Sequence, residues 1–527
     1  MCDATGDHKS ICCWANNCIK KTQINMRKII TTTCMLACLL VNACTTIAQI
    51  KTAETRTIIT TDGEVDDQDS FLRLLLYSNE FNIEGLVYSS SQWHYKGDGK
   101  GTKFISAMAT TKDRYGERTE LRWPGTTWMQ TFIDKYAMVF DNLKKHDKNY
   151  PSPQYLKSII KTGNIDFEGE MDVDTEGSNF IKNILLDDKP GPVYLQIWGG
   201  TNTVARALKS IEDEYKNTAQ WESIYKKISD KAILYTVLDQ DAAYQKYVAP
   251  NWPAIRVMYN ADQFWCLAYP WPNFVPAELQ TTLKGKWFAE HIKFNHGPLM
   301  SSYFLWGDGQ KIENDPEHTH GDTAEAKKYG LTQYDFISEG DSPAFFYLIN
   351  VGLRNMEDAS YGGWGGRMVQ SKTNPHRWED GKHVTDYNPY TKKEDAAYPQ
   401  TRWLNVLQND FATRADWCVN GYDKANHAPI VKLNHANNIT AKPGTVVKLS
   451  GSAKDPDGNA VNYKWWQYVE VDSYNGKIDI QNADKQTASC IIPADAKTGE
   501  TIHIILEVTD TGTPQLTRYQ RVIITVK

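Results

Sequence analysis

Short apolar stretches alternate with amphipathic ones along the first four fifths of the chain. Residues 71–78 and 203–211 carry apolar positions at helical spacing. Brief apolar or β-branched stretches bounded by turn or polar residues predict strands at 57–61, 83–89, 193–198, 232–237 and 255–259. A repeated strand-then-helix order is typical of parallel strands joined by crossover helices. The sequence therefore predicts an α/β fold with a doubly wound, mainly parallel sheet.

The pattern changes after about residue 427. Short alternating stretches follow, separated by turn residues such as those at 455–459 (DPDGN), and they predict strands at 428–431, 446–449, 463–466 and 502–508. Such spacing is typical of a small immunoglobulin-like β-sandwich. We therefore expect an α/β domain at residues 54–425 and an all-β sandwich at 426–527.

Two adjacent tryptophans lie on one predicted strand of this sandwich. Neighbouring strand residues face opposite sides of a sheet, so only one of Trp465 and Trp466 can face the core. The other is a candidate glycan contact.

Residues 1–53 are predicted to be an N-terminal extension that contains an export signal. Arg27 and Lys28 precede the apolar residues 29–48, which end in a small-residue cleavage signature, and Met26 is then a candidate start. A cut before Cys44 would instead give a lipoprotein, which fits less well because Asn42 suits a lipidation motif poorly. No other stretch is apolar enough to span a bilayer, so we expect a soluble protein exported to the periplasm or the cell exterior.

Composition narrows the classes of function. A net charge of -6 and a pI near 6.1 provide no basic surface for nucleic acid. Seven of the ten cysteines lie at or before Cys44, and the other three are too far apart in sequence for a disulfide framework. The 17 Trp and 28 Tyr include enough rings to stack on sugars or bases, although most are expected in the core.

An acidic motif directly after the first predicted strand carries the main chemical signal. Residues 62–69 (DGEVDDQD) hold five carboxylates. Open α/β sheets bind ligands at the carboxyl ends of their strands. Crowded carboxylates raise one another's pKa unless a cation or hydrogen bonds offset the repulsion, so the motif indicates a bound divalent ion. The alternative is a solvated acidic turn that begins a helix.

Three motifs in order resemble the calcium-dependent nucleoside hydrolase family. They are the acidic motif, residues 198–202 (WGGTN) ahead of a helix, and residues 339–343 (EGDSP) ahead of another. With residues 362–367 (GGWGGR) and the trailing sandwich, the chain is similar over 54–527 to the exported branch of that family labelled cellulose-binding.

The resemblance implies a role for individual residues. Asp62, Asp67, Asp341 and the main-chain carbonyl of Thr201 would bind Ca²⁺, which prefers six to eight hard oxygen ligands. Asp62 and Asp341 would be the catalytic residues, with Asp62 the general base that activates a water. Asp66 would accept a hydrogen bond from a sugar hydroxyl. The other expected substrate-binding residues are Gln92, Asn202, Glu339 and Trp364, of which Trp364 is expected to be exposed for sugar stacking.

The implied activity is hydrolysis of an N-glycosidic or related glycosidic bond by water attack at the anomeric carbon, with inversion. Some positions depart from the family. Thr60 stands where the family has an Asp, and Gly63-Glu64 replace a Pro-Gly. Gly340 stands where many nucleoside hydrolases have the His that protonates the leaving base.

The leaving-group acid is therefore open. Its candidates are Glu339, His296, His318 and His320, although each His is more simply an ordinary surface or core residue. Residues 315–322 (DPEHTHGD) fit an ordered acidic loop better than a transition-metal site. The alternative function is a catalytically silent carbohydrate-binding protein that retains the metal site. The expected partner is accordingly a small glycoside or nucleoside, or a polysaccharide.

Overall fold

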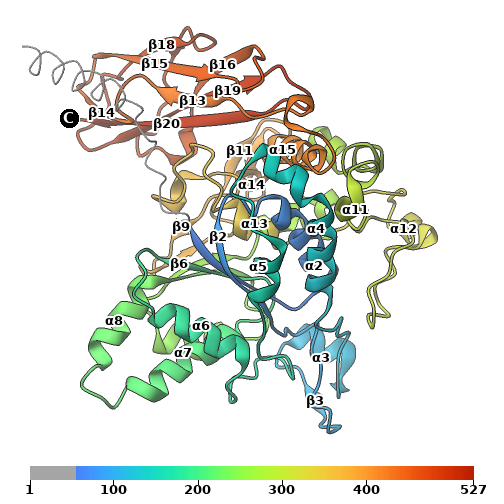
Figure 1. Ribbon diagram of the computed structural model, residues 1–527. Helices are drawn as coiled ribbons and strands as arrows, with labels where there is room; N and C mark the ends of the chain where they lie inside the picture. The colour runs from blue at the N-terminus through green and yellow to red at the C-terminus, as the bar shows by residue number, and fades with distance from the viewer. Residues whose placement is uncertain (1–54) are drawn as a thin grey trace, which may run out of the picture. The chain divides into compact units, whose positions relative to one another are not determined.

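An eight-stranded sheet is the centre of the α/β part of the protein (Figure 1). The computed structural model describes residues 55–527, and the predicted export signal, Met26 and Cys44 lie outside this range. The strand order is β5-β2-β1-β6-β7-β8-β10-β9, and every pair is parallel except β10 with β9. The strands are β1 (Arg56–Thr61), β2 (Asn82–Tyr88), β5 (Ile160–Thr162), β6 (Val193–Ile197), β7 (Ala232–Val237), β8 (Arg256–Asn260), β9 (Val369–Gln370) and β10 (Arg377–Glu379).

Helices cover both faces of this sheet, as Figure 1 shows. Ile58 and Ile59 are adjacent on β1 and belong to two different hydrophobic cores. One core is shared with α6 (Glu176–Leu186), α7 (Asn202–Tyr215) and α8 (Trp221–Lys231). The other is shared with α2 (Val65–Leu76), α4 (Trp128–His146), α5 (Pro153–Ser158), α13 (Ser342–Phe346) and α15 (Leu404–Trp417). The predicted doubly wound α/β fold is confirmed.

The sheet changes winding direction between β1 and β6. The chain passes from β1 to β2 and β5 on one side, then returns to place β6 on the other side of β1. The carboxyl ends of two strands that part in this way leave a crevice, where α/β proteins bind ligands. Asp62 follows β1 directly, and the turn at 198–201 follows β6.

The C-terminal part is a sandwich of two four-stranded sheets, which confirms the predicted all-β fold. The first has the order β13 (Ile430–Leu433), β15 (Val446–Lys454), β18 (Thr487–Ile491) and β17 (Ile480–Gln481). The second has β14 (Asn438–Ala441), β20 (Thr517–Val526), β19 (Thr501–Asp510) and β16 (Val461–Gln467), and all pairs are antiparallel except β14 with β20. The exact domain boundary at 425/426 stays a prediction.

The paired tryptophans of β16 face opposite sides, as predicted. Trp465 is 2 % exposed in the sandwich core. Trp466 packs instead against the larger α/β core, with its ring 6.3 Å from that of Trp403. The outer tryptophan is therefore partly covered by the α/β domain, which leaves less of it for a glycan.

The α/β and sandwich parts share one core. Tyr468, Ile505 and Tyr519 of the sandwich belong to the same buried cluster as the helices on one face of the large sheet. Residues 55–527 accordingly make one compact unit. No helix within this range has the length and apolar character needed to cross a membrane.

Candidate functional site

A cavity of about 220 Å³ opens beyond the carboxyl ends of β1, β6, β7 and β8. One part of its lining is acidic and the rest is aromatic, aliphatic and basic. The lining residues are Glu64, Asp66, Asp67, Trp93, Arg114, Arg122, Trp198, Val237, Leu238, Gln240, Phe264, Trp265, Ala268, Tyr269 and Asp341.

Three aspartates converge at the acidic end. Asp66 and Asp67 lie in the first turn of α2 and Asp341 immediately precedes α13, and carboxylate oxygens of the three lie within 4.8 Å of one another. Burial, and then repulsion among the acids, raises the pKa of all three carboxyls well above the usual value. A hard divalent cation would reverse this shift, and an all-oxygen donor set suits such an ion. The cluster could therefore bind a metal ion.

Asp62 lies beside these three and has the opposite shift. It is 2 % exposed, and its Oδ2 is 3.3 Å from Nδ1 of His94. Burial raises its pKa, but the hydrogen bond and the charge of His94 together outweigh burial and leave the pKa below the usual value. Asp62 also shares a hydrogen bond with Asp67. It is thus the most readily ionised of the four aspartates, although it is not among the lining residues of the cavity.

The turn that carries Thr201 packs directly on Asp62. A Cβ at Gly199 would lie 2.9 Å from that of Asp62, so only glycine allows this approach. The N–H of Asn202 donates to Asp241 at 2.8 Å, and the Thr201 carbonyl accepts the N–H of Ala205. No contact within residues 55–527 joins that carbonyl to the carboxylates, so its role as a metal ligand stays a prediction.

The other expected substrate-binding residues, apart from Asp66, do not line the cavity. Gln92 accepts a hydrogen bond from the Thr111 hydroxyl at 2.7 Å and is 7 % exposed. Glu339 is fully buried and pairs with Arg73 at 2.7 Å. The expected exposure of Trp364 is wrong, because its ring is 1 % exposed and lies under the Arg518 guanidinium.

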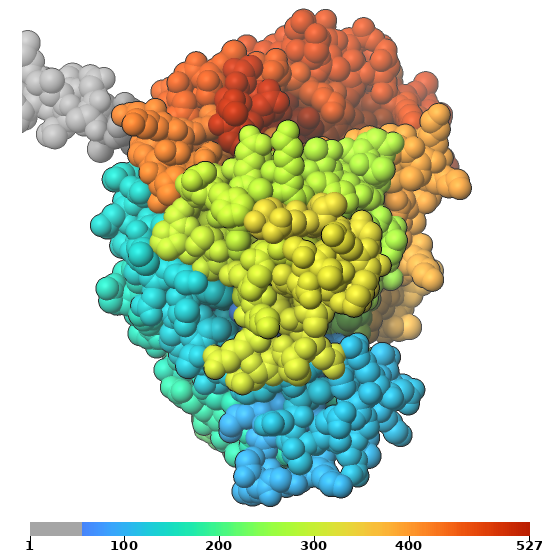
Figure 2. All heavy atoms as spheres, turned by 90° about the vertical axis from the view of Figure 1, so that its right-hand side faces the viewer, coloured from blue at the N-terminus to red at the C-terminus, as the bar shows by residue number. Residues whose placement is uncertain are grey.

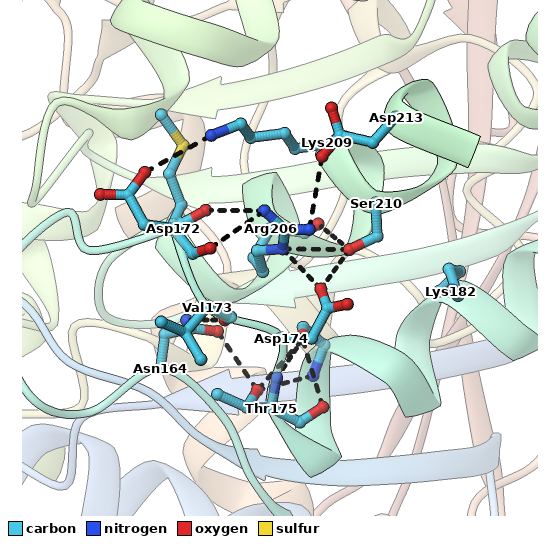
Figure 3. Close-up of polar contacts among 12 residues, drawn as sticks. Asn164, Asp172, Val173, Asp174, Thr175, Lys182, Arg206, Lys209, Ser210 and Asp213 are labelled. Atoms are coloured by element: carbon cyan, nitrogen blue, oxygen red, sulfur yellow. Dashed lines mark hydrogen bonds and ion pairs between the residues drawn. The ribbon is translucent and has the colours of Figure 1, made fainter. Parts of the chain in front are cut away.

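Asn202 belongs to a polar network that supports the start of α7. Its amide donates to the Ser90 hydroxyl and to the main-chain carbonyl of Asn164, both at 2.9 Å. Figure 3 shows that the loop containing Asn164 is held to α7 by Arg206, whose Nε donates to Asp174 at 2.6 Å. Arg206 also donates to two main-chain carbonyls of this loop. This network explains why the Asn202 side chain points into the protein.

None of the candidate leaving-group acids reaches the cavity. Glu339 is held by Arg73, and His296 is bonded to Asp416 at 3.1 Å. The rings of His318 and His320 contact each other through their Nδ1 atoms at 3.2 Å. Burial is the main cause that lowers the pKa of His318 to about 4 and of His320 to about 3, so both are neutral at physiological pH.

Several side chains at the site had no assigned role in the sequence prediction. Glu64 accepts the Tyr269 hydroxyl at 2.9 Å and lies 3.8 Å from Arg122. His94 is buried between Asp62 and Asp315. Burial and Arg122 disfavour its charged form, but the negative charges of Asp315, 3.7 Å from Nε2, and of Asp62, hydrogen-bonded to Nδ1, prevail and raise its pKa to about 9. Only the position of His94 just after β2 could have been noticed in the sequence.

Fold and site together define an α/β protein of the nucleoside hydrolase-like class. A family model described as cellulose-binding Sde182, nucleoside hydrolase-like domain, matches residues 56–368. A second, described as the C-terminal domain of cellulose-binding protein Sde0182, matches residues 446–526. The chain belongs to this cellulose-binding, nucleoside hydrolase-like family.

A solved structure supports this assignment over nearly the whole chain. It is a nucleoside hydrolase-related hypothetical protein from Saccharophagus degradans that is associated with carbohydrate metabolism. The identity is 26%, the TM-score is 0.67, and the match covers 90% of this chain and 100% of the other. A plant nucleoside hydrolase is matched with 9% identity and a TM-score of 0.31, over 68% of this chain and 99% of the other. A search of curated proteins found no match.

Proposed function

We propose that this protein is a Ca²⁺-dependent hydrolase that cleaves the glycosidic bond of a nucleoside or a related glycoside. The observation that carries the proposal is the convergence of Asp66, Asp67 and Asp341 at the end of a cavity, beside an ionised Asp62. Family membership supports it, because the larger family domain is nucleoside hydrolase-like.

Each aspartate of the site would have a separate role. Asp62, Asp67 and Asp341 would hold a Ca²⁺ ion, which would supply positive charge and orient the water and sugar oxygens bound to it. Asp62, held as a carboxylate by His94, would take the proton of the attacking water. Asp66 would accept a hydrogen bond from a sugar hydroxyl. Carboxylates around the sugar would stabilise an oxocarbenium-like transition state, and the product would have inverted configuration.

The aromatic part of the cavity lining would receive the leaving group. Trp93, Phe264 and Trp265 offer apolar contact there. Tyr269 presents a hydroxyl beside Glu64, and burial, followed by the charges of Asp66 and Glu64, raises its pKa well above the usual value. The phenol therefore keeps its proton at neutral pH, and after turning from Glu64 it would donate a hydrogen bond to the departing atom without transferring the proton.

The test is a substrate panel of nucleosides and 4-nitrophenyl glycosides, assayed with CaCl₂ and with a chelator. We expect release of reducing sugar that stops when Ca²⁺ is removed. The Asp62→Ala variant should lose about two to four orders of magnitude in kcat, the usual contribution of a general base. Sugar release that persists at the wild-type rate in Asp62→Ala would refute the proposed role of Asp62.

A second function is favoured by the family description and by Gly340. A protein without the usual leaving-group His could bind a polysaccharide and leave it intact, and the family is named for cellulose binding. Sedimentation with insoluble cellulose distinguishes this function: binding that survives both the chelator and Asp62→Ala, without sugar release, supports it. The binding function fits an exported protein, because cellulose lies outside the cell.

A further inference from the structure

Two segments far apart in the sequence contact each other beside the cavity. Residues 93–122 contain β3 (Phe104–Ile105), α3 (Ala109–Tyr115) and β4 (Glu117–Arg118), and residues 306–330 contain α12 (Thr323–Lys328). Figure 2 shows the two segments, blue and yellow respectively, lying against each other on one face of the molecule. Residues Trp93, Arg114 and Arg122 of the first segment line the cavity.

Two acidic residues of the second segment join it to the first. Asp315 accepts two hydrogen bonds from the Arg122 guanidinium, both at 2.9 Å. Glu317 accepts hydrogen bonds from Arg114 at 2.6 Å and from the Tyr115 hydroxyl at 2.8 Å. Both acids therefore hold the same pair of segments together.

Only Asp315 of these two also reaches the site. Its Oδ2 is 3.7 Å from Nε2 of His94, and Nδ1 of the same ring is 3.3 Å from Oδ2 of Asp62. Asp315, His94 and Asp62 are all buried, with exposures of 6 %, 1 % and 2 %. A continuous chain of contacts thus runs from the partly buried Arg122 through the buried Asp315 and His94 to Asp62.

We propose that Asp315 is a positioning residue that fixes the carboxylate of Asp62 through His94. An imidazole between two carboxylates has its ring orientation set from both edges. The bidentate hydrogen bond from Arg122 fixes one of these carboxylates, that of Asp315. Loss of Asp315 would leave one edge of the His94 ring without its charged neighbour. Asp62 would then lose the fixed partner that keeps it in place for a cation and a water.

This inference rests on the metal site of the proposed function. It goes further, because it makes the acidic loop at 315–322 part of the site, although that loop supplies no metal ligand and does not line the cavity. It also links the contact between the two segments to the position of the Asp62 carboxylate.

The experiment is a calorimetric titration of the full chain with CaCl₂. Outer partners of a metal ligand typically change metal affinity or activity by 10–100-fold, so Asp315→Asn should weaken Ca²⁺ binding by about tenfold. Glu317→Gln is the matched control, because it loosens the same two segments without touching His94. Its Ca²⁺ affinity should equal that of the wild type.

Arg122→Lys keeps the charge and loses the two-pronged bond, so it serves where Asp315→Asn does not fold. It should weaken Ca²⁺ binding in the same direction. On any glycoside that the panel identifies, Asp315→Asn should lower kcat and leave KM nearly unchanged, because Asp315 does not touch the cavity.

Equal Ca²⁺ affinity in Asp315→Asn and the wild type would overturn the inference, and so would an equal loss in Glu317→Gln. A wild type that binds no Ca²⁺ would overturn both the inference and the proposed metal. A wild type that binds Ca²⁺ but cleaves no glycoside would refute only the proposed hydrolysis, because the affinity comparison would remain valid.

Discussion

At the residue scale, the four aspartates of the site differ because their partners differ. Asp62 faces His94, whereas Asp66, Asp67 and Asp341 face mainly one another in a buried pocket. A carboxyl whose pKa is higher in the folded protein than in the unfolded chain stabilises the folded state. This contribution is fully present at a pH below the pKa of the unfolded chain. That stability is lost as the pH rises through the folded pKa. The Ca²⁺-free protein should therefore become less stable between about pH 4 and neutral pH.

Asp341→Asn should separate metal binding from folding stability. Removal of one buried negative charge relieves repulsion, so in a chelator the variant should unfold a few degrees above the wild type at pH 7. The wild type should be stabilised by added CaCl₂, because a ligand that binds only the folded state shifts the equilibrium by mass action. The variant should lose this response. Thermal unfolding at pH 5 and pH 7, with and without CaCl₂, measures both effects.

Glu168→Gln is the control for that comparison. Burial also raises the pKa of Glu168, but its carboxylate accepts the N–H of Ala107 and takes no part in the cluster. It should keep the full response to CaCl₂. A full response in Asp341→Asn would show that the cluster is not the Ca²⁺ site.

At the element scale, α7 depends on Arg206 for its position. Arg206 is 8 % exposed and bonds Asp174 and the carbonyls of Met171 and Asp172, while its backbone lies one turn into the helix. The turn directly before this helix packs on Asp62. The network in Figure 3 therefore links a distant loop to the shape of the site.

Arg206→Ala should lower the free energy of unfolding by about 1–3 kcal/mol, the usual cost of leaving buried polar groups without partners. Urea unfolding measures the change. Lys209→Ala lies on the same helix and loses only an exposed ion pair with Asp172, so it should cost under about 1 kcal/mol. Equal costs for the two variants would contradict the structural role of Arg206.

At the scale of the whole molecule, a buried arginine joins the sandwich to the α/β part. Arg521 on β20 is fully buried, and it donates to the main-chain carbonyls of Leu353 and Tyr361, each at 2.6 Å. The shared core around Tyr468 and Tyr519 adds apolar contact. The two parts should therefore unfold together.

Calorimetry should show one transition for the wild type and two for Arg521→Met. Methionine fills much of the space but leaves buried carbonyls without donors, a cost of about 3 kcal/mol or more. Lys464→Met removes an ion pair with Glu507 that lies wholly within the sandwich, and it should keep the single transition. Two transitions in the wild type would show that the interface does not couple the parts.

The sequence by itself determined the architecture and the acidic end of the site. Hydrophobic periodicity is a local property, so the alternation of strands and helices and the change near residue 427 could be predicted from it. The position of Asp62 just after a strand also followed from the chain, because strand ends meet at one edge of a parallel sheet. Asp341, more than 270 residues further on, was assigned only through the resemblance of its motif.

Only the tertiary structure decided which other side chains reach the cavity. Trp364, Gln92 and Glu339 lie in segments with suitable composition, but their orientation depends on partners such as Arg518, Thr111 and Arg73 that are distant in the chain. The chain from Arg122 through Asp315 and His94 to Asp62 joins separate segments, and no local pattern encodes such a contact. Local periodicity fixes the elements and the strand ends, whereas the pairing of buried charges is fixed when the loops pack.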